Sequence, residues 1–158
     1  MSTNDIGFRV FMATAHPATN NEPGFDALVW VAVDGVQSIG ERGIAHSGID
    51  VPDLQSGFTP QVKGAGAGRD TVMTFRTIAN NAGQASMKTV ADSPAGVVSF
   101  KIIRGSGVGG APVIGDPVEY AQGILHSYTA REKSTTSHGG YSVTFRNNAP
   151  WVDALEDA

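Results

Sequence analysis

The sequence predicts a mostly antiparallel β domain with one short α-helix near residues 82–91. Apolar and polar residues alternate with a period of two in at least four segments, which is the pattern of half-buried strands. A single segment shows helical spacing instead. Glycine makes up 20 of the 158 residues and charged residues only 16%, which favours a turn-rich chain with few solvated helical faces.

Three strands are expected early in the chain. Residues 8–12 form a weaker candidate, and residues 28–33 form a short apolar run that we expect to be buried on both faces. Asp34-Gly35 is a strong two-residue hairpin signal. We therefore expect residues 36–39 to pair back onto that apolar run.

The remaining strands show clearer alternation. Residues 73–76, 98–102 and 141–146 each place apolar side chains on one face and polar side chains on the other. Residues 118–128 are expected to form one long strand with a bend at Gly123, because glycine inside a strand often marks a bend.

The helix is predicted over residues 82–91, where apolar side chains recur at helical spacing. Asn81 and Gln84 resemble a capping box with Asn in the cap position, and Pro94 follows shortly after the expected end. No other segment favours a helix.

Long stretches without periodicity are expected to be loops. They cover residues 13–27, 41–60 and 105–117, and loops of this length are often functional or mobile. The longest, 41–60, is expected to be mobile in the free subunit and ordered against another copy. Residues 64–68 are expected to form a glycine-rich turn.

Length and composition indicate a single domain over residues 1–158, with an acidic tail over 149–158. The net charge of −4 and the absence of any basic run argue against a direct nucleic-acid binder. No cysteine is present, which excludes disulfides and thiolate chemistry. The polar start of the chain, residues 1–5, has no secretory signal pattern, so we expect synthesis in the cytoplasm.

Motifs for catalysis or cofactor binding are not assembled in the sequence. Gly105, Gly107 and Gly110 form a G-x-G-x-x-G, but prolines and a strand follow where a dinucleotide site needs a helix, so a hairpin loop is expected. The sequence contains no nucleophile elbow and no recognised metal-ligand spacing. We therefore expect no enzyme activity, no cofactor and no metal.

Three stretches near the start of the chain carry a family resemblance. They are Val10-Phe-Met-Ala-Thr-Ala-His-Pro-Ala-Thr19, Gly24-Phe-Asp-Ala-Leu-Val-Trp30 and Val33-Asp-Gly-Val-Gln-Ser-Ile-Gly-Glu-Arg-Gly43. This order resembles the tail tube proteins, or major tail proteins, of long-tailed phages and gene transfer agents. The resemblance covers roughly residues 8–148, and no single motif in it is diagnostic; the order of the segments carries it.

The resemblance implies an antiparallel β-sandwich or partly closed barrel with one flanking helix and long loops between subunits. It also implies a structural virion protein that forms hexameric rings, stacked into a hollow tube that conducts DNA without binding it specifically. Its partners would be further copies of itself and other tail proteins at the tube ends, with no membrane involved. The protein would reside in the tail of a virion or phage-like particle after synthesis in the bacterial host.

Two groups of residues are candidates for roles in such a tube. Candidate subunit contacts are Pro17, Phe25, Trp30, Arg42, Asp50, Asp53, Leu54 and Phe58, and candidate lumen-facing carboxylates are Asp70 and Glu119.

Two other functions remain open at the level of sequence. A capsid decoration or tail-completion protein would bind an assembled particle without polymerising. A carbohydrate-binding β-sandwich would need an exposed aromatic platform, for which two Trp and three Tyr are few.

Overall fold

The structure is a computed structural model that describes residues 7–132, 134–136 and 139–156. The polar residues 1–5 and the last two residues of the acidic tail lie outside this range. The elements are β1 (Phe8–Ala13), α1 (Glu22–Asp26), β2 (Val31–Val33), β3 (Val36–Ile39), β4 (Ile44–Asp50), β5 (Gln61–Gly68), β6 (Asp70–Arg76), α2 (Ala82–Asp92), β7 (Val97–Arg104), the 3-10 turn η1 (Val108–Gly110), β8 (Pro117–Ala130), β9 (Gly140–Asn147) and β10 (Val152–Leu155).

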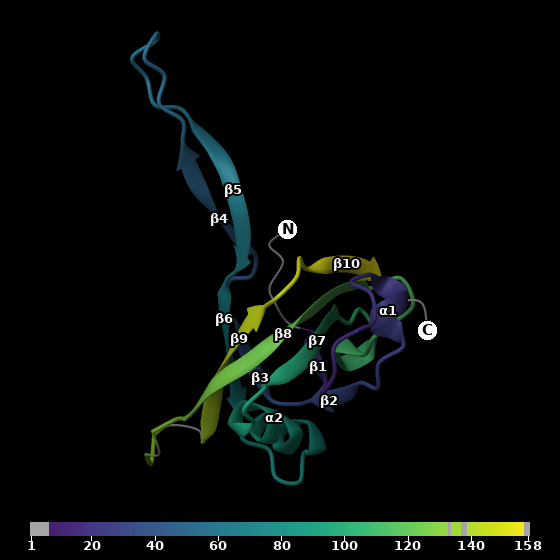
Figure 1. Cartoon of the computed structure of the whole chain (residues 1–158). Helices are drawn as coiled ribbons and strands as arrows, with labels where there is room; N and C mark the ends of the chain where they lie inside the picture. The colour runs from purple at the N-terminus through teal and green to yellow at the C-terminus, as the bar shows by residue number, and fades with distance from the viewer. Residues whose placement is uncertain (1–6, 133, 137–138, 157–158) are drawn as a thin grey trace.

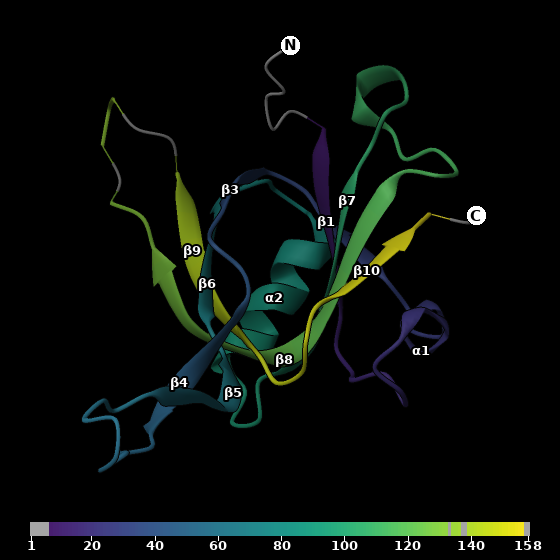
Figure 2. The same cartoon turned by 90° about the horizontal axis from the view of Figure 1, so that it is seen from above.

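One curved antiparallel sheet forms the body of the protein (Figure 1). Its strand order is β2-β1-β7-β8-β9-β6-β3, and β10 pairs additionally with the first residues of β8. The prediction of a mostly β, antiparallel fold is confirmed. A single sheet curls around α2 in place of two stacked sheets (Figure 2).

The two ends of the sheet meet at Asp34-Gly35. β2 and β3 lie at opposite ends of the strand order, yet these two residues alone connect them in the chain. The sheet must therefore curl until its ends come together, and we call this junction the seam. Gly35 has a φ of +84°, and a Cβ there would lie 2.5 Å from the carbonyl oxygen of Arg76, so the close approach requires glycine.

The predicted hairpin at Asp34-Gly35 is therefore wrong. β3 pairs with β6, in the register Val36 to Phe75, and β2 pairs with β1. The turn is present, but the strands on either side of it pair with strands far away in the sequence. The run 28–33 is also not buried on both faces, since only Val31–Val33 is a strand and Val29 is 83% exposed.

Gln84 of α2 closes the seam. Its side-chain amide nitrogen donates to the carbonyl oxygens of Asp34 (2.7 Å) and Arg76 (2.8 Å). Its amide oxygen accepts from the backbone N–H of Ile78 at 3.0 Å. Gln84 is 8% exposed, so its buried amide has all its hydrogen bonds to backbone groups of the seam.

The predicted helix is confirmed, and its local chemistry is as expected. Asn81 is the N-cap and accepts from the backbone N–H of Gln84 at 2.9 Å. Met87 and Val90 turn inward and join the main core, which fills the concave face of the sheet. A second helix, α1, was not predicted; it begins after Asn21, whose side chain caps the N–H of Gly24.

The long strand β8 is confirmed and holds the sheet together. Its first half pairs with β7 and β10, and from Gly123 onward β9 takes the place of β10. Gly123 thus marks the change of partner, where a Cβ would collide with the backbone of Arg146. The apolar alternation of β7 and β9 places Phe100 and Phe145 edge-to-face in the core, with ring centroids 4.9 Å apart.

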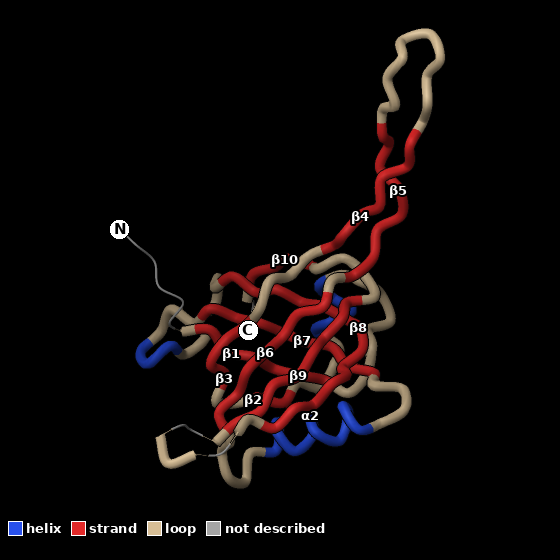
Figure 3. Tube along the Cα trace, turned by 90° about the vertical axis from the view of Figure 1, so that its left-hand side faces the viewer, coloured by secondary structure: helices blue, strands red, loops and turns tan. Residues whose placement is uncertain are grey.

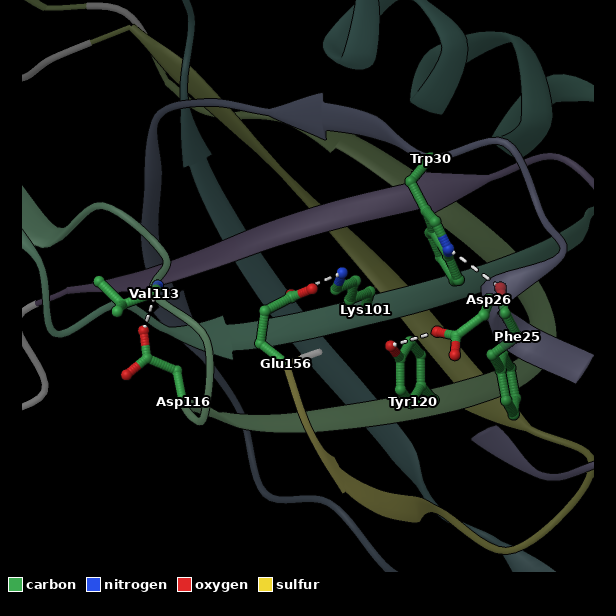
Figure 4. Close-up of polar contacts among 8 residues, drawn as sticks. All are labelled: Phe25, Asp26, Trp30, Lys101, Val113, Asp116, Tyr120 and Glu156. Atoms are coloured by element: carbon green, nitrogen blue, oxygen red, sulfur yellow. Dashed lines mark hydrogen bonds and ion pairs between the residues drawn. The ribbon is translucent and has the colours of Figure 1, made fainter. Parts of the chain in front are cut away.

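A second apolar cluster covers part of the convex face. Phe25 of α1 stacks on Tyr120 of β8 with centroids 5.0 Å apart, and Trp30 lies 5.9 Å from the same ring. The Tyr120 hydroxyl donates to Asp26 at 3.0 Å (Figure 4). The rest of the convex face, over β6 and β9, has no such cover among the described residues.

Replacing Gln84 by Glu tests the role of the seam. The two side chains have nearly the same shape, but a carboxylate cannot donate to the Asp34 and Arg76 carbonyls. We expect the free energy of unfolding to fall by about 2–4 kcal/mol at neutral pH, because buried acceptors lose their donors. Urea denaturation measures this, with the exposed Asp92→Asn on the same helix as the control. Equal midpoints for both variants would contradict the assignment.

Candidate assembly surface

A two-stranded arm projects from the body (Figures 1 and 3). β4 and β5 pair antiparallel, from Ile44 opposite Gly68 to Asp50 opposite Gln61. We define the arm as residues 44–68. The expected loop 41–60 is thus only partly a loop, and the predicted turn at 64–68 is wrong because these residues belong to β5.

Glycines let the two strands of the arm approach each other closely. A Cβ at Gly64 would lie 2.7 Å from the hydroxyl oxygen of Ser47, so the strands can approach only with glycine there. Both faces of the arm are exposed almost throughout. The apolar alternation used to predict strands was therefore absent, since a ribbon with two solvated faces has no buried side to mark.

The tip of the arm, residues 51–60, is an ordered turn. The N–H of Val51 donates to the carbonyl of Pro60 (2.8 Å), and the N–H of Asp53 donates to that of Phe58 (3.1 Å). The Asp53 carboxylate accepts from the N–H of Gln55 at 2.9 Å. Hydrogen bonds from Gln55 and Ser56 lower the pKa of Asp53, which keeps its negative charge at the tip.

Apolar side chains at the tip have no partner within the described subunit. Leu54 is 102% exposed and Phe58 is 78% exposed. Side chains exposed to this extent bury little apolar surface in the isolated subunit. The exposed apolar residues of the arm are Ile49, Val51, Leu54, Phe58 and Val62. Clustered exposed apolar side chains of this kind mark a contact with another protein. Leu54 and Phe58 are among the residues predicted from the sequence as subunit contacts, whereas the other three were not predicted.

The base of the arm is fixed to the body by Arg42. Its guanidinium lies 2.8 Å from the Glu119 carboxylate of β8 and 5.6 Å from the centroid of the Trp151 ring. Glu119, a predicted lumen residue, is thus engaged in an ion pair. Asp70, the other predicted lumen residue, is exposed on β6 and lies 3.7 Å from His126.

The remaining predicted contact residues lie inside the subunit. Pro17 is buried, and Phe25 is fully buried against Tyr120. Trp30 is half-buried and donates from its indole nitrogen to the Phe25 carbonyl at 3.1 Å (Figure 4). The structure does not bring these three residues together with the arm residues Asp50, Asp53, Leu54 and Phe58.

A second exposed apolar segment is the glycine-rich loop between β7 and β8, which is confirmed as a hairpin connection. Val108 is 100% exposed and Ile114 is 73% exposed. The Asp116 carboxylate accepts hydrogen bonds from the N–H and hydroxyl of Ser106 and from the N–H of Val113. These hydrogen bonds connect the two sides of the loop and hold its conformation.

The C-terminal segment is held beside this loop. Lys101 and Glu156 form an ion pair of 2.9 Å with both side chains largely buried (Figure 4). The backbone of Glu156 also bonds to Gly115 and Asp116. The end of the described chain is therefore part of the folded body.

Among the described residues, no three His, Asp or Glu side chains are grouped as a metal site would require. Nor does any described helix have the length and apolar character needed to cross a bilayer. The surfaces that stand out are apolar projections, which suit contact with protein.

The fold of the whole chain is similar to that of several solved structures. A chain from the PVC sheath/tube terminator of an extracellular contractile injection system superposes with a TM-score of 0.65 at 8% identity, covering 98% of this chain and 97% of that one. The chain has the fold of tail tube and tube-terminator proteins. The tube-terminating cap of the anti-feeding prophage gives a TM-score of 0.61 at 14% identity, covering 100% and 93%.

A gene transfer agent provides a further structural neighbour. A chain from the tail of an empty gene transfer agent particle matches with a TM-score of 0.58 at 14% identity, covering 99% of each chain. Sequence comparison alone gives no match to a family model or to a curated protein. The structural neighbours agree with the resemblance to tail tube proteins seen in the sequence.

The loop ordered by Asp116 provides a pH-dependent prediction. Hydrogen bonds from Ser106 and Val113 lower the pKa of Asp116. Its stabilising effect is therefore present above the pKa of an unfolded Asp, near 3.8, and is lost as the pH falls through the lower folded value. Amide hydrogen exchange of Ser106 and Val113 should rise in Asp116→Ala at pH 6, and not in the exposed control Asp153→Ala. Unchanged exchange in Asp116→Ala would contradict the assignment.

Proposed function

We propose that this protein is a structural tail protein that self-assembles through its arm into stacked rings. The observation that carries this proposal is the arm itself, an ordered ribbon that projects from the body and exposes Leu54 and Phe58 at its tip. A fold shared with tail components of phage-like particles supports it. An apolar tip of this kind becomes stable only when another surface covers it.

The finer assignment is a ring of six copies, stacked into a hollow tube through which DNA passes. An arm on one copy and its receiving surface on the next form a heterologous contact, and such contacts close into rings or continue as filaments. The free edges of the sheet supply further backbone groups for pairing between copies. Other tail proteins would bind at the ends of the tube.

Net charge supports the role of conduit. Six copies at −4 each give a ring charge of about −24, which offers the phosphates of DNA few cations to bind. The DNA can then slide with little friction. No bond-making step and no cofactor are part of this function.

A tail-completion protein is the alternative that one observation favours. Two of the structural neighbours come from terminating assemblies, a sheath/tube terminator and a tube-terminating cap. A protein of that type would bind an assembled particle at the end of its tube and would not polymerise.

Removing the arm tests the proposal. Residues 47–65 are replaced by Asn-Gly, so that His46 and Gly66, which face each other across the ribbon, close a short hairpin. The body should keep its circular dichroism spectrum and thermal stability, because the arm contributes little to the cores. Negative-stain microscopy at high concentration should show tubes for the wild type and dispersed protein for the variant.

Other results of the microscopy would contradict the proposal or support the alternative. Normal tubes from the variant without the arm would overturn its role in assembly. Single wild-type rings that do not stack would support the tail-completion alternative. Dispersed wild-type protein at all concentrations would contradict self-assembly.

The conduit role is tested by adding charge. Asp70→Lys should leave tubes intact but slow DNA passage, because six new cations per ring create phosphate contacts that must break as the DNA advances. Delivery of DNA by assembled particles is measured across a range of salt concentrations, with the effect largest at low salt. Asp92→Lys, on α2, is the matched control. Equal delivery by both variants would contradict the placement of Asp70 in the lumen.

A further inference from the structure

The two ends of the sheet are joined through a chemically labile dipeptide. Asp34 and Gly35 are the only residues between β2 and β3. In an Asp-Gly sequence the backbone nitrogen of the glycine can attack the side-chain carbon Cγ of the aspartate, because glycine has no side chain to hinder the approach. Asp34 is exposed, so water reaches the reacting atoms. The seam therefore contains a candidate site of spontaneous chemical modification.

The fold requires the residue that makes this site reactive. Gly35 has a φ of +84°, and a Cβ there would lie 2.5 Å from the carbonyl oxygen of Arg76 and 3.1 Å from the side-chain nitrogen of Gln84. A larger residue at position 35 would hinder the attack, but it would also collide with the seam. The same glycine thus allows the close approach at the seam and leaves Asp34 open to attack.

One side chain restrains the Asp34 carboxylate. The side-chain nitrogen of Asn81, the N-cap of α2, donates to Oδ2 of Asp34 at 2.9 Å. The main chain of the turn is held as well, because the Asp34 carbonyl accepts from Gln84 and the Gly35 carbonyl accepts from the N–H of Arg76, both at 2.7 Å. Ring closure draws Cγ to the Gly35 nitrogen, so it competes with the hydrogen bond to Asn81 and needs a local opening of the turn.

We infer that Asp34 is a site of spontaneous isomerisation to isoaspartate, and that Asn81 slows this reaction by holding the carboxylate. In the first step the Gly35 nitrogen bonds to Cγ of Asp34. The carboxyl OH leaves with the proton of that nitrogen as water, and a five-membered succinimide remains. In the second step one water opens the ring. Opening at the former main-chain carbonyl leaves the chain connected through Cγ, which is isoaspartate. Water is the only co-reactant, and self-assembly is not assumed.

The product changes the connection that closes the sheet. Isoaspartate adds one carbon atom to the main chain at residue 34 and turns the former main-chain carbonyl into a free carboxylate. That carbonyl is the group that accepts from Gln84, and the chain on its far side no longer fixes it. The Gly35 carbonyl, which accepts from Arg76, is displaced with it. A chain with isoaspartate at residue 34 should therefore unfold at a lower urea concentration.

Ageing of the full-length protein tests the inference. The wild type and Asn81→Ser are kept in mildly acidic buffer made with oxygen-18 water. Serine is a good N-cap, so this variant keeps an acceptor for the Gln84 N–H and loses the donor to Asp34. Asn81→Asp, which has the shape of Asn but no side-chain donor, is the second variant.

The readout is the peptide that contains Asp34. Each opening of a succinimide adds one heavy oxygen from the solvent, which mass spectrometry detects, and chromatography separates the isoaspartate peptide from the normal one. Asp92-Ser93, at the other end of α2, is the internal control in all three proteins. A synthetic peptide of residues 28–40 gives the rate of the same sequence without the fold.

We expect isoaspartate at residue 34 to accumulate in the wild type, and about threefold faster in both variants, because a single hydrogen bond between exposed side chains adds a modest restraint. The rate at Asp92 should be the same in all three proteins. The isoaspartate fraction of aged wild type should have a lower urea midpoint than fresh protein.

Three results would overturn the inference. Equal rates at residue 34 in the wild type and both variants would contradict the role of Asn81. Absence of heavy oxygen at residue 34 in all three proteins, with uptake in the synthetic peptide, would contradict the site itself. Faster reaction at residues 34 and 92 together would show that the variants loosen the whole of α2, which would contradict a specific hold on Asp34.

Discussion

The fold depends on one buried amide. Gln84 donates to two carbonyls and accepts from one N–H where the two ends of the sheet meet. Because two acceptors need donors and one donor needs an acceptor, a primary amide is the neutral side chain that meets all three. The helix that carries Gln84 also fills the concave face with Met87 and Val90. The same helix therefore joins the two ends of the sheet and covers its core.

The curl of the sheet also explains the placement of the surfaces. Because β2 is only three residues long, the seam is closed near Asp34-Gly35 and open near Phe8. The chain leaves this open end through Arg42, whose contacts with Glu119 and Trp151 fix the base of the arm to β8 and the C-terminal segment. The arm follows β3 in the chain, and the recess at the open end of the seam is lined by residues of the same strand.

A structural role accounts for features that would be costly in an isolated protein. Exposed Leu54, Phe58 and Val108 invite association, and an unpaired sheet edge does the same. In a polymer, these exposed side chains and sheet edges would be covered by specific contacts between copies. The buried apolar packing of the subunit lies elsewhere, in the two clusters with their aromatic pairs.

Elements with one buried face could be predicted from the local pattern of their residues. The strands around Phe100 and Phe145 and the helix capped by Asn81 carry their patterns locally, so they could be predicted. Asp34-Gly35 could not reveal its partners, because a turn signal does not say which strands it joins. Phe25 was read as a contact residue, and the structure buries it against distant Tyr120. The arm had no periodicity because both its faces meet solvent. Strand pairing and side-chain exposure depend on residues far apart in the chain, so they could be read only from the folded protein.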